Sequence, residues 1–245
     1  MEKIRNAFYA KAAHIVGVSA VVFVMSIMSV QGAQVFFDDF SSYPAGNCLP
    51  DGTSFGPWTV VFAGFGCVKI ETDGVNQWLH AVPKVPTGGN THSALIVGPS
   101  FSSATSTASS TLTYDVNVKT IDQTRAGGRK APRPWEVGWV VWHYTDNDHF
   151  YYFIPKTNGW ELGKRDPAYI GGQRFLATGT SPTFPIGQQY AVHITQDASN
   201  TMTASVNGVL LTTFTDFERP YTSGKIGLYT EDAHVHFDDV SVSQP

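Results

Sequence analysis

The chain has 245 residues, with 16 Lys and Arg against 20 Asp and Glu, which gives a formal net charge of −4. This acidic balance argues against a nucleic-acid partner, and the length is enough for one large domain. Glycine and proline are frequent, at 23 and 14 residues, so the sequence favours a fold with many turns over one built of long helices.

The N-terminus has the layout of a secretory signal peptide. Three basic residues precede an apolar run over residues 15–30, and the small residues Gly32 and Ala33 follow it. An uncleaved membrane anchor is the alternative, but serines dilute the run and its length is marginal for a span. We expect a signal peptide over residues 1–33 and one exported domain over residues 34–245, in the extracellular space or the periplasm. Cleavage would leave 13 Lys and Arg against 19 Asp and Glu, a net charge of −6.

Cys48 and Cys67 are the only cysteines, and they lie 19 positions apart. An even count in an exported chain indicates a disulfide that closes an N-terminal loop. In the chain-entropy model, a loop of this length stabilises the folded state by roughly 3 kcal/mol.

Beyond the leader, short runs of alternating apolar residues are separated by Gly, Pro, Asn and Asp. Such spacing is typical of an all-β sandwich or barrel. Asn207 and Gly208 form a strong type I′ hairpin signal. Besides a meander within residues 135–166, the predicted strands are 35–40, 58–62, 68–71, 78–81, 93–97, 111–118, 174–178, 189–196, 202–206, 209–213, 225–229 and 235–242.

A basic cluster lies in the stretch 123–134, which also contains Gly and Pro. A solvated loop is one interpretation, and contact with an anionic partner such as a uronic-acid polymer is the other. Its members are Arg125, Arg129, Lys130 and Arg133.

The segment 135–166 is the most informative part of the chain. It contains four tryptophans and two turn signals, at 145–148 and 156–159, each bounded by aromatic and β-branched residues. This pattern predicts a three-stranded antiparallel meander.

The register of the meander decides which side chains share a face. A two-residue first loop pairs Tyr144 with His149, and side chains then alternate with a period of two. One face carries Gly138, Val140, Trp142, Tyr151, Phe153 and Leu162, with Glu136 and Lys164 at its ends. The other face carries Trp135, Trp139, His143, Phe150, Tyr152, Glu161 and Arg165. Because the second face mixes aromatic rings with ionisable groups, we expect it to bind a ligand.

Motifs spread over the whole predicted domain resemble a known fold family. They are FDDFS at 37–41, GWELGK at 159–164, YAVHI at 190–194, GKIGLY at 224–229 and FDDVSV at 237–242. Together they resemble the concanavalin A-like jelly roll of the laminin-G and family 16 hydrolase type. The resemblance implies an all-β sandwich of two antiparallel sheets. It specifies the fold better than the activity, because the superfamily includes lectins, carbohydrate-binding modules, glucanases and polysaccharide lyases.

The catalytic signatures of two such groups do not occur in the sequence. There is no Glu-x-Asp-x-Glu of family 16 glucanases, and no Arg-x-Glu-x-Arg with Gln-x-His of alginate-lyase-like jelly rolls. The activity must therefore be argued from the residues themselves.

Hydrolysis of a glycosidic bond needs two carboxyl groups that flank it. Glu161 is one candidate, but Glu136 falls on the opposite predicted face, so the partner must come from another strand or loop. The candidates are Glu231, Asp232 and Asp148. The alternative is a structural ion pair of Glu161 with Arg165, Arg174 or Lys164.

Lyase-type elimination needs a cation for the uronate carboxylate, a base and an acid. Arg165, His143 and Tyr152 share the predicted face and are suitable types. Hydrogen bonds within the sheet are the alternative role for His143 and Tyr152. The predicted catalytic residues are thus Glu161, His143, Tyr152 and Arg165.

Aromatic side chains on the same face match the apolar faces of sugar rings. We therefore predict substrate binding by Trp135, Trp139 and Phe150, and Tyr152 could also stack on a sugar. Packing in the core is the alternative role for these rings.

Two acidic pairs lie near the ends of the predicted domain. Since the first and last strands of jelly rolls run side by side, the resemblance implies a structural Ca²⁺ site. Its ligands would be Asp38, Asp39, Asp238 and Asp239.

His234 and His236 fall on one face of the last strand, an arrangement that a transition metal could use. No third ligand lies nearby in the sequence, so a surface or packing role is favoured for this pair.

The sequence therefore predicts a secreted polysaccharide-degrading enzyme, either a glycoside hydrolase or a polysaccharide lyase. A non-catalytic carbohydrate-binding module is the alternative. The expected partner is a polysaccharide or oligosaccharide, with no nucleic acid and no membrane after signal cleavage, and we expect a monomer.

Overall fold

The computed structural model describes residues 32–87, 89–103, 111–125 and 131–245. The chain divides into the units Met1–Val30 and Gln31–Pro245, and the described residues all belong to the second. Almost all of the predicted signal peptide lies outside the described residues, as do Arg129 and Lys130 of the basic cluster. Within the described ranges, no helix is long and apolar enough to cross a membrane.

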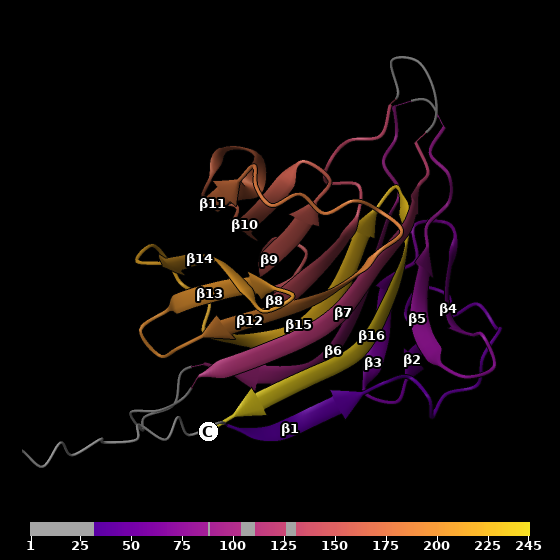
Figure 1. Cartoon of the computed structure of the whole chain (residues 1–245), viewed down its shortest axis with the longest axis horizontal. Coiled ribbons are helices and arrows are strands. Elements are labelled where there is room, and N and C mark those ends of the chain that lie inside the picture. Colours follow the sequence, from indigo (N-terminus) through magenta and orange to yellow (C-terminus); the bar gives the residue numbers. More distant parts are fainter. Residues whose placement is uncertain (1–31, 88, 104–110, 126–130) are drawn as a thin grey trace, which may run out of the picture. The chain divides into compact units, whose positions relative to one another are not determined.

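Two antiparallel sheets make up the domain (Figure 1). Sheet A has the order β14-β13-β12-β7-β16-β5-β4, and β1 pairs with β16. Its strands are β14 (Val209–Thr215), β13 (Thr201–Val206), β12 (Gln189–Gln196), β7 (Leu112–Gln123), β16 (Ala233–Gln244), β5 (Gln77–Val82), β4 (Cys67–Thr72) and β1 (Ala33–Asp38).

Sheet B has the order β11-β10-β9-β8-β15-β6-β3-β2. Its strands are β11 (Gln173–Gly179), β10 (Gly159–Arg165), β9 (His149–Lys156), β8 (Gly138–Asp146), β15 (Ser223–Glu231), β6 (Ser93–Ser102), β3 (Trp58–Phe62) and β2 (Ser54–Phe55). Each predicted strand is present, so the all-β jelly-roll sandwich of two antiparallel sheets is confirmed.

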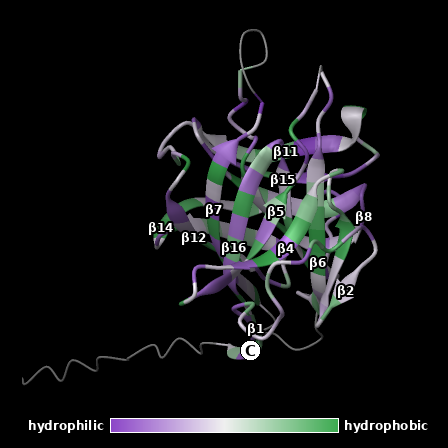
Figure 2. Ribbon diagram, turned by 90° about the vertical axis from the view of Figure 1, so that its right-hand side faces the viewer, coloured by the Kyte–Doolittle hydropathy of each residue, from purple (hydrophilic) through white to green (hydrophobic). Residues whose placement is uncertain are grey.

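Alternation of side chains builds the core between the sheets. Figure 2 shows hydrophobic and hydrophilic residues alternating along β7 and β16. From sheet B the core receives Val140, Trp142, Tyr151, Phe153 and Leu162, the residues that the predicted register placed on one face. The opposite face of sheet B is thereby left for a second cluster, which contains Trp139, Phe150 and Tyr152.

Two local predictions near the sheet ends are also confirmed. Cys48 and Cys67 form a disulfide with a Cα–Cα distance of 5.2 Å, which joins the N-terminal loop to β4. Asn207 and Gly208 form the turn between β13 and β14, and both have the positive φ of a type I′ turn, 50° and 77°.

The first turn of the meander departs from the predicted register. Trp142 opposes Tyr151 as expected, but Asp146 pairs with His149 in place of Tyr144. The cause is a bulge in β8 between Trp142 and Asp146, which shifts the register of the pairing with β9.

The bulge moves His143 off the predicted binding face. His143 has a φ of 51°, and its Nε2 lies 3.1 Å from the Ser103 hydroxyl oxygen. Its ring centroid lies 6.4 Å from that of Tyr151, a core residue. Tyr144 joins the Trp139 side of the sheet. The prediction that His143 shares a face with Tyr152 and Glu161 is therefore wrong.

Glycine at position 224 permits this geometry. Gly224 lies on β15 with a φ of 145°, and a Cβ there would stand 2.5 Å from the carbonyl carbon of His143. A larger residue would push β15 away from the bulge, so Gly224 and the His143 conformation depend on each other.

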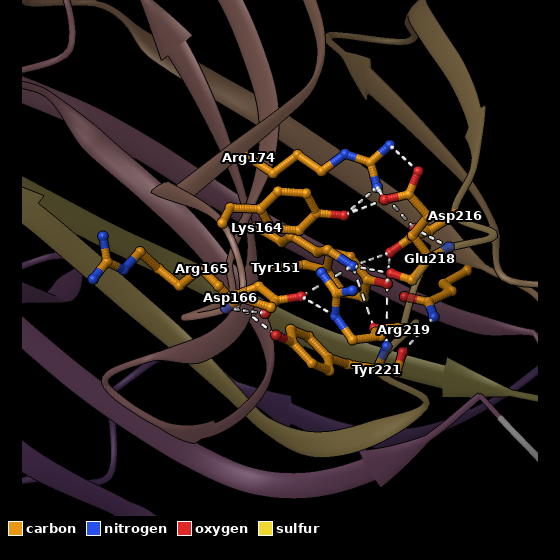
Figure 3. Close-up of polar contacts among 12 residues, drawn as sticks. Tyr151, Lys164, Arg165, Asp166, Arg174, Asp216, Glu218, Arg219 and Tyr221 are labelled. Carbon is orange, nitrogen blue, oxygen red and sulfur yellow. Dashed lines mark hydrogen bonds and ion pairs between the residues drawn. The ribbon is translucent and has the colours of Figure 1, made fainter. Parts of the chain in front are cut away.

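A buried ion-pair network joins β10 to the connection after β14 (Figure 3). The Lys164 ammonium is fully buried, 2.7 Å from an Asp216 carboxylate oxygen, and it also donates to the Arg219 carbonyl oxygen at 3.2 Å. The Tyr151 hydroxyl donates to the same Asp216 carboxylate at 2.7 Å. The network thus fixes the connection that follows β14 onto the inner face of sheet B.

Candidate functional site

The outer face of sheet B contains two adjoining cavities of about 290 and 280 Å³. They share Trp139, Gln173 and Glu231 as lining residues, and we call them together the Trp139 cleft. The first is also lined by Trp135, Ile154, Lys156, Glu161 and Phe175, and the second by Phe62, Phe150, Arg165 and Tyr229.

Aromatic rings form a rigid floor to the Trp139 cleft. The Trp139 ring centroid lies 5.0 Å from that of Tyr152 and 4.9 Å from that of Tyr229. The Trp139 indole N–H donates to the Trp135 carbonyl oxygen at 2.8 Å. Because the Trp139 ring packs against two other rings and is hydrogen-bonded through its N–H, the 7% of its surface that stays exposed is held in a fixed position in the cleft.

The three predicted sugar-binding residues all line this cleft. Trp139 lines both cavities, Trp135 the first and Phe150 the second. The Arg133 guanidinium lies 5.3 Å above the Trp135 ring, so this basic residue packs against the cleft wall.

Glu161 lies in the first cavity with both carboxylate oxygens engaged. The Lys156 ammonium donates to Oε2 at 2.8 Å, and the Tyr152 hydroxyl donates to Oε1 at 3.1 Å. Glu161 pairs with Ile154 across the hairpin, and Lys156 lies two residues further along on the same face. The ion-pair partner is therefore Lys156, and not Arg165, Arg174 or Lys164 as the structural alternative supposed.

Glu231 supplies a second carboxyl group to the first cavity. It ends β15, and its Oε1 accepts a hydrogen bond from the Tyr229 hydroxyl at 2.6 Å. Burial raises the pKa of Glu231, and the negative charges of Asp232 and Glu136 raise it further against the opposing effect of Tyr229. Two carboxyl groups with different surroundings thus line one cavity.

The other two predicted partners of Glu161 have different roles. Asp232 forms a buried ion pair with Arg125, whose Nε also lies 2.6 Å from Glu136. Asp148 lies in the β8–β9 turn, 3.3 Å from the Arg165 guanidinium. Since Arg125 is paired on both sides, a solvated loop does not describe this member of the basic cluster.

Arg165 lines the Trp139 cleft and Tyr152 lies beside it, bonded to Glu161, whereas His143 lies elsewhere. The Tyr152 hydroxyl accepts a hydrogen bond from Gln173 at 2.6 Å, and burial raises its pKa far above the usual range. Arg165 lines the second cavity and donates to the Gly171 carbonyl oxygen at 3.1 Å. Burial lowers the pKa of His143 to about 4, so its ring is neutral at physiological pH.

Glycine at position 163 makes room for Tyr152. Gly163 lies opposite Tyr152 in the β9–β10 pair, and a Cβ there would stand 2.2 Å from the Tyr152 hydroxyl oxygen. The Tyr152 ring can therefore lie across β10 and reach Glu161.

Several cleft residues were not identified from the sequence. Lys156 and Tyr229 contact the two carboxyl groups, Gln173 contacts Tyr152, and Phe62 lines the second cavity. The period-two spacing of Tyr229 and Glu231 in β15 was a usable signal. For Gln173 and Phe62 the sequence carries no comparable signal, because their strands reach the cleft only through long-range pairing.

The four aspartates of the expected calcium site are engaged by protein donors. The Asp38 carboxylate accepts hydrogen bonds from the Phe40 N–H at 2.8 Å, the Tyr43 hydroxyl at 2.6 Å and the Trp58 indole at 2.8 Å. Asp39, Asp238 and Asp239 accept from Ser41, Asn76 and Asn117. Strands β1 and β16 pair as expected, and each of the four carboxylates accepts at least one hydrogen bond from the protein; the shared Ca²⁺ site stays a prediction.

Neither a protein-family model nor a curated protein matches the sequence. Solved structures do match. Carbohydrate binding module CBM66 from Bacillus subtilis has a TM-score of 0.53 and 14% identity, over 79% of this chain and 99% of that chain. An endo-1,3-beta-glucanase from Streptomyces sioyaensis has a TM-score of 0.51 and 13% identity, over 89% of this chain and 98% of that chain. The T. cruzi calreticulin globular domain has a TM-score of 0.53 and 11% identity, over 87% of this chain and 88% of that chain. These proteins differ in their described roles, so the likeness concerns the fold. The chain has the concanavalin A-like jelly-roll fold that its sequence motifs predicted.

Proposed function

We propose that this chain is an exported glycoside hydrolase that cleaves a polysaccharide in the Trp139 cleft. The observation that carries the proposal is that Glu161 and Glu231 line one cavity in different electrostatic surroundings. Pairs of carboxyl groups that differ in this way are the basis of acid–base division in glycosidases. At the N-terminus, basic residues are followed by an apolar run and then by small residues, and this order supports export.

The roles of the two carboxyl groups follow from their contacts. Glu231, whose pKa is raised, is the better proton donor of the two and protonates the glycosidic oxygen as the bond from that oxygen to the anomeric carbon breaks. Glu161, paired with the Lys156 ammonium, is the carboxylate that faces the developing positive charge on the sugar. Water supplies the hydroxyl group of the new reducing end, and its remaining proton restores Glu231.

Elimination by a lyase has less support from the geometry. A lyase needs a base near the C5 proton, and His143 contacts Ser103 and Tyr151 outside the cleft. The raised pKa of Tyr152 disfavours the phenolate that would replace His143 as base. Hydrolysis is therefore the reaction that this set of residues supports best.

A non-catalytic carbohydrate-binding module is the second candidate. The aromatic floor and the engaged carboxylate of Glu161 favour it, and one structure of similar fold is described as a carbohydrate binding module. A panel of polysaccharides separates the candidates when reducing ends, unsaturated uronate absorbance and binding heat are all measured. New reducing ends without absorbance support the hydrolase, absorbance supports a lyase, and binding heat alone supports the module.

Trp139→Ala should weaken polysaccharide binding by roughly 1–3 kcal/mol, through lost stacking on a sugar ring. Isothermal titration with a bound oligosaccharide measures this effect. Trp160→Phe is the control, because Trp160 belongs to the core cluster and not to the cleft. Equal affinity of Trp139→Ala and the unchanged protein would remove Trp139 from the binding surface.

The pH profile of hydrolysis should report the Glu231 proton. The acid must be protonated, so kcat/KM should fall as the pH rises through the raised pKa of Glu231. Tyr229→Phe removes a hydrogen bond that stabilises the charged carboxylate, and should therefore move this alkaline limb to higher pH. A limb that stays in place, or moves to lower pH, would exclude Glu231 as the acid.

A further inference from the structure

A second cluster of ionisable side chains lies on the outer face of sheet A, on the strands β4, β5 and β16. These strands are neighbours in the sheet, and Figure 2 shows them side by side. His80 pairs with Lys69 on one side and with His236 on the other, and Glu71 lies two residues beyond Lys69 on the same face. The cluster is independent of the Trp139 cleft, which belongs to sheet B.

One carboxylate oxygen of Glu71 faces two imidazole rings. Nδ1 of His80 is in hydrogen-bond contact with Oε2 of Glu71, and Nε2 of His236 lies 3.7 Å from the same oxygen. The two ring centroids are 4.4 Å apart at an angle of 86°. One potential ligand atom from each of the three residues lies within 4.8 Å of the others.

Packing holds both imidazoles in this arrangement. The Trp78 ring stacks on His236 with a centroid distance of 4.6 Å. Nε2 of His80 is buried, and among the described residues it has no hydrogen-bond partner. Burial lowers the pKa of His236 to about 4 and also lowers that of His80, which opposes a positive charge on either ring.

A purely structural His–Glu pair accounts for only part of this geometry. Glu71 and His80 would suffice for such a pair, whereas His236 adds a second imidazole beside the same oxygen. Some zinc sites have three protein ligands, two imidazoles and a carboxylate, and water takes the fourth position.

We propose that Glu71, His80 and His236 bind a divalent transition-metal ion of the zinc type. Imidazole and carboxylate ligands suit this class of ion. Of the His234 and His236 pattern in the sequence, only His236 belongs to the site, and the neighbouring strands β4 and β5 supply the other two ligands, Glu71 and His80.

Other charged groups on the same face define the limits of the site. The Lys69 ammonium lies 3.5 Å from the second oxygen of Glu71, and Lys119 pairs with His236 across the β16–β7 ladder. His234 lies with its ring 6.2 Å from that of His80, but its Nδ1 is 2.9 Å from Asp122. The site therefore takes its ligands from Glu71, His80 and His236 while His234 keeps its own partner.

Binding would join three strands of sheet A. β4 is the last strand in the sheet order, and the ion would link it through Glu71 to β5 and to β16. Because the ion binds the folded arrangement and not the unfolded chain, it should raise the melting temperature, and the rise should grow with the logarithm of the ion concentration above Kd.

The test is a titration of the whole chain, stripped with a chelator and free of any histidine tag, with Zn²⁺ and with Co²⁺. We expect one equivalent of Zn²⁺ to bind, a higher melting temperature, and a visible Co²⁺ absorption band. His80→Gln, His236→Gln and Glu71→Gln should each weaken binding roughly tenfold or more. His193→Gln is the matched control, since His193 lies on the same sheet and pairs only with Asp115 among the described side chains.

Several outcomes would overturn the proposal. They are the absence of Zn²⁺ binding to the unchanged protein, equal binding by the three ligand variants, and loss of binding in the His193→Gln or His234→Gln protein. Glu71→Gln changes a partly exposed side chain at the sheet edge, so it keeps the test valid if a histidine variant does not fold. No sugar is present in this titration, and its result does not depend on the proposed hydrolase activity.

Discussion

Glu231→Gln should lower the rate of polysaccharide hydrolysis about 100-fold to 10,000-fold, the usual contribution of a general acid. A glutamine side chain has the same shape but cannot donate the proton that the leaving oxygen needs. Substrate affinity should change little, because Trp139 and the other aromatic residues of the cleft remain. Single-turnover rates and binding heats measured on the same oligosaccharide separate these two effects.

Glu161→Gln should lower the rate to a similar extent, for a different reason. It removes the negative charge that faces the sugar and leaves the Lys156 ammonium without its partner at 2.8 Å. Glu218→Gln is the control for both variants, because it removes an exposed carboxylate outside the residues that line the cleft. Turnover near that of the unchanged protein in either cleft variant would refute the assigned roles.

Asp216→Ala should destabilise the fold by about 3–5 kcal/mol, which is typical when one member of a buried ion pair is removed. Lys164 has no exposed surface, and its ammonium would lose the carboxylate oxygen at 2.7 Å. Asp166, at 3.8 Å, is too distant to replace that contact fully. The Tyr151 hydroxyl would lose its acceptor as well. Urea denaturation at neutral pH measures the change in the free energy of unfolding.

Two further variants make this stability test specific. Lys164→Met combined with Asp216→Leu removes both charges, and should recover part of the loss, because no unpaired charge stays buried. Glu218→Gln changes an exposed carboxylate that contacts Arg174 and the Tyr169 hydroxyl, and it should cost about 1 kcal/mol or less. A small loss in Asp216→Ala, similar to that of Glu218→Gln, would show that the network contributes little to stability.

The strands were predictable because their signal is local. Alternating residues such as Val140, Trp142 and Val116 reveal an inner face within a few positions, and the turn at Asn207 and Gly208 is encoded by two adjacent residues. Pairing of Trp142 with Tyr151 followed from the same alternation. The aromatic part of the Trp139 cleft was therefore accessible from the sequence.

The positions of the ionisable residues were harder to predict from the sequence. The position of His143 depends on a bulge and on its close approach to Gly224, which lies some eighty positions later in the chain. Glu231 lines the same cavity as Glu161 because β15 pairs with β8, and the sequence contains no signal for that pairing of strands. In the same way, His80 and Glu71 meet His236 through the pairing of β5 with β16.

A crystal structure of the Glu231→Gln protein with an oligosaccharide bound tests the central claim most directly. The oligosaccharide should come from a polysaccharide that the unchanged protein degrades. We expect a sugar ring stacked on Trp139, with the glycosidic oxygen beside residue 231 and the anomeric carbon facing the Glu161 carboxylate. Sugar bound on another face of the domain, or in the cleft but away from both side chains, would contradict the proposed hydrolysis at this site.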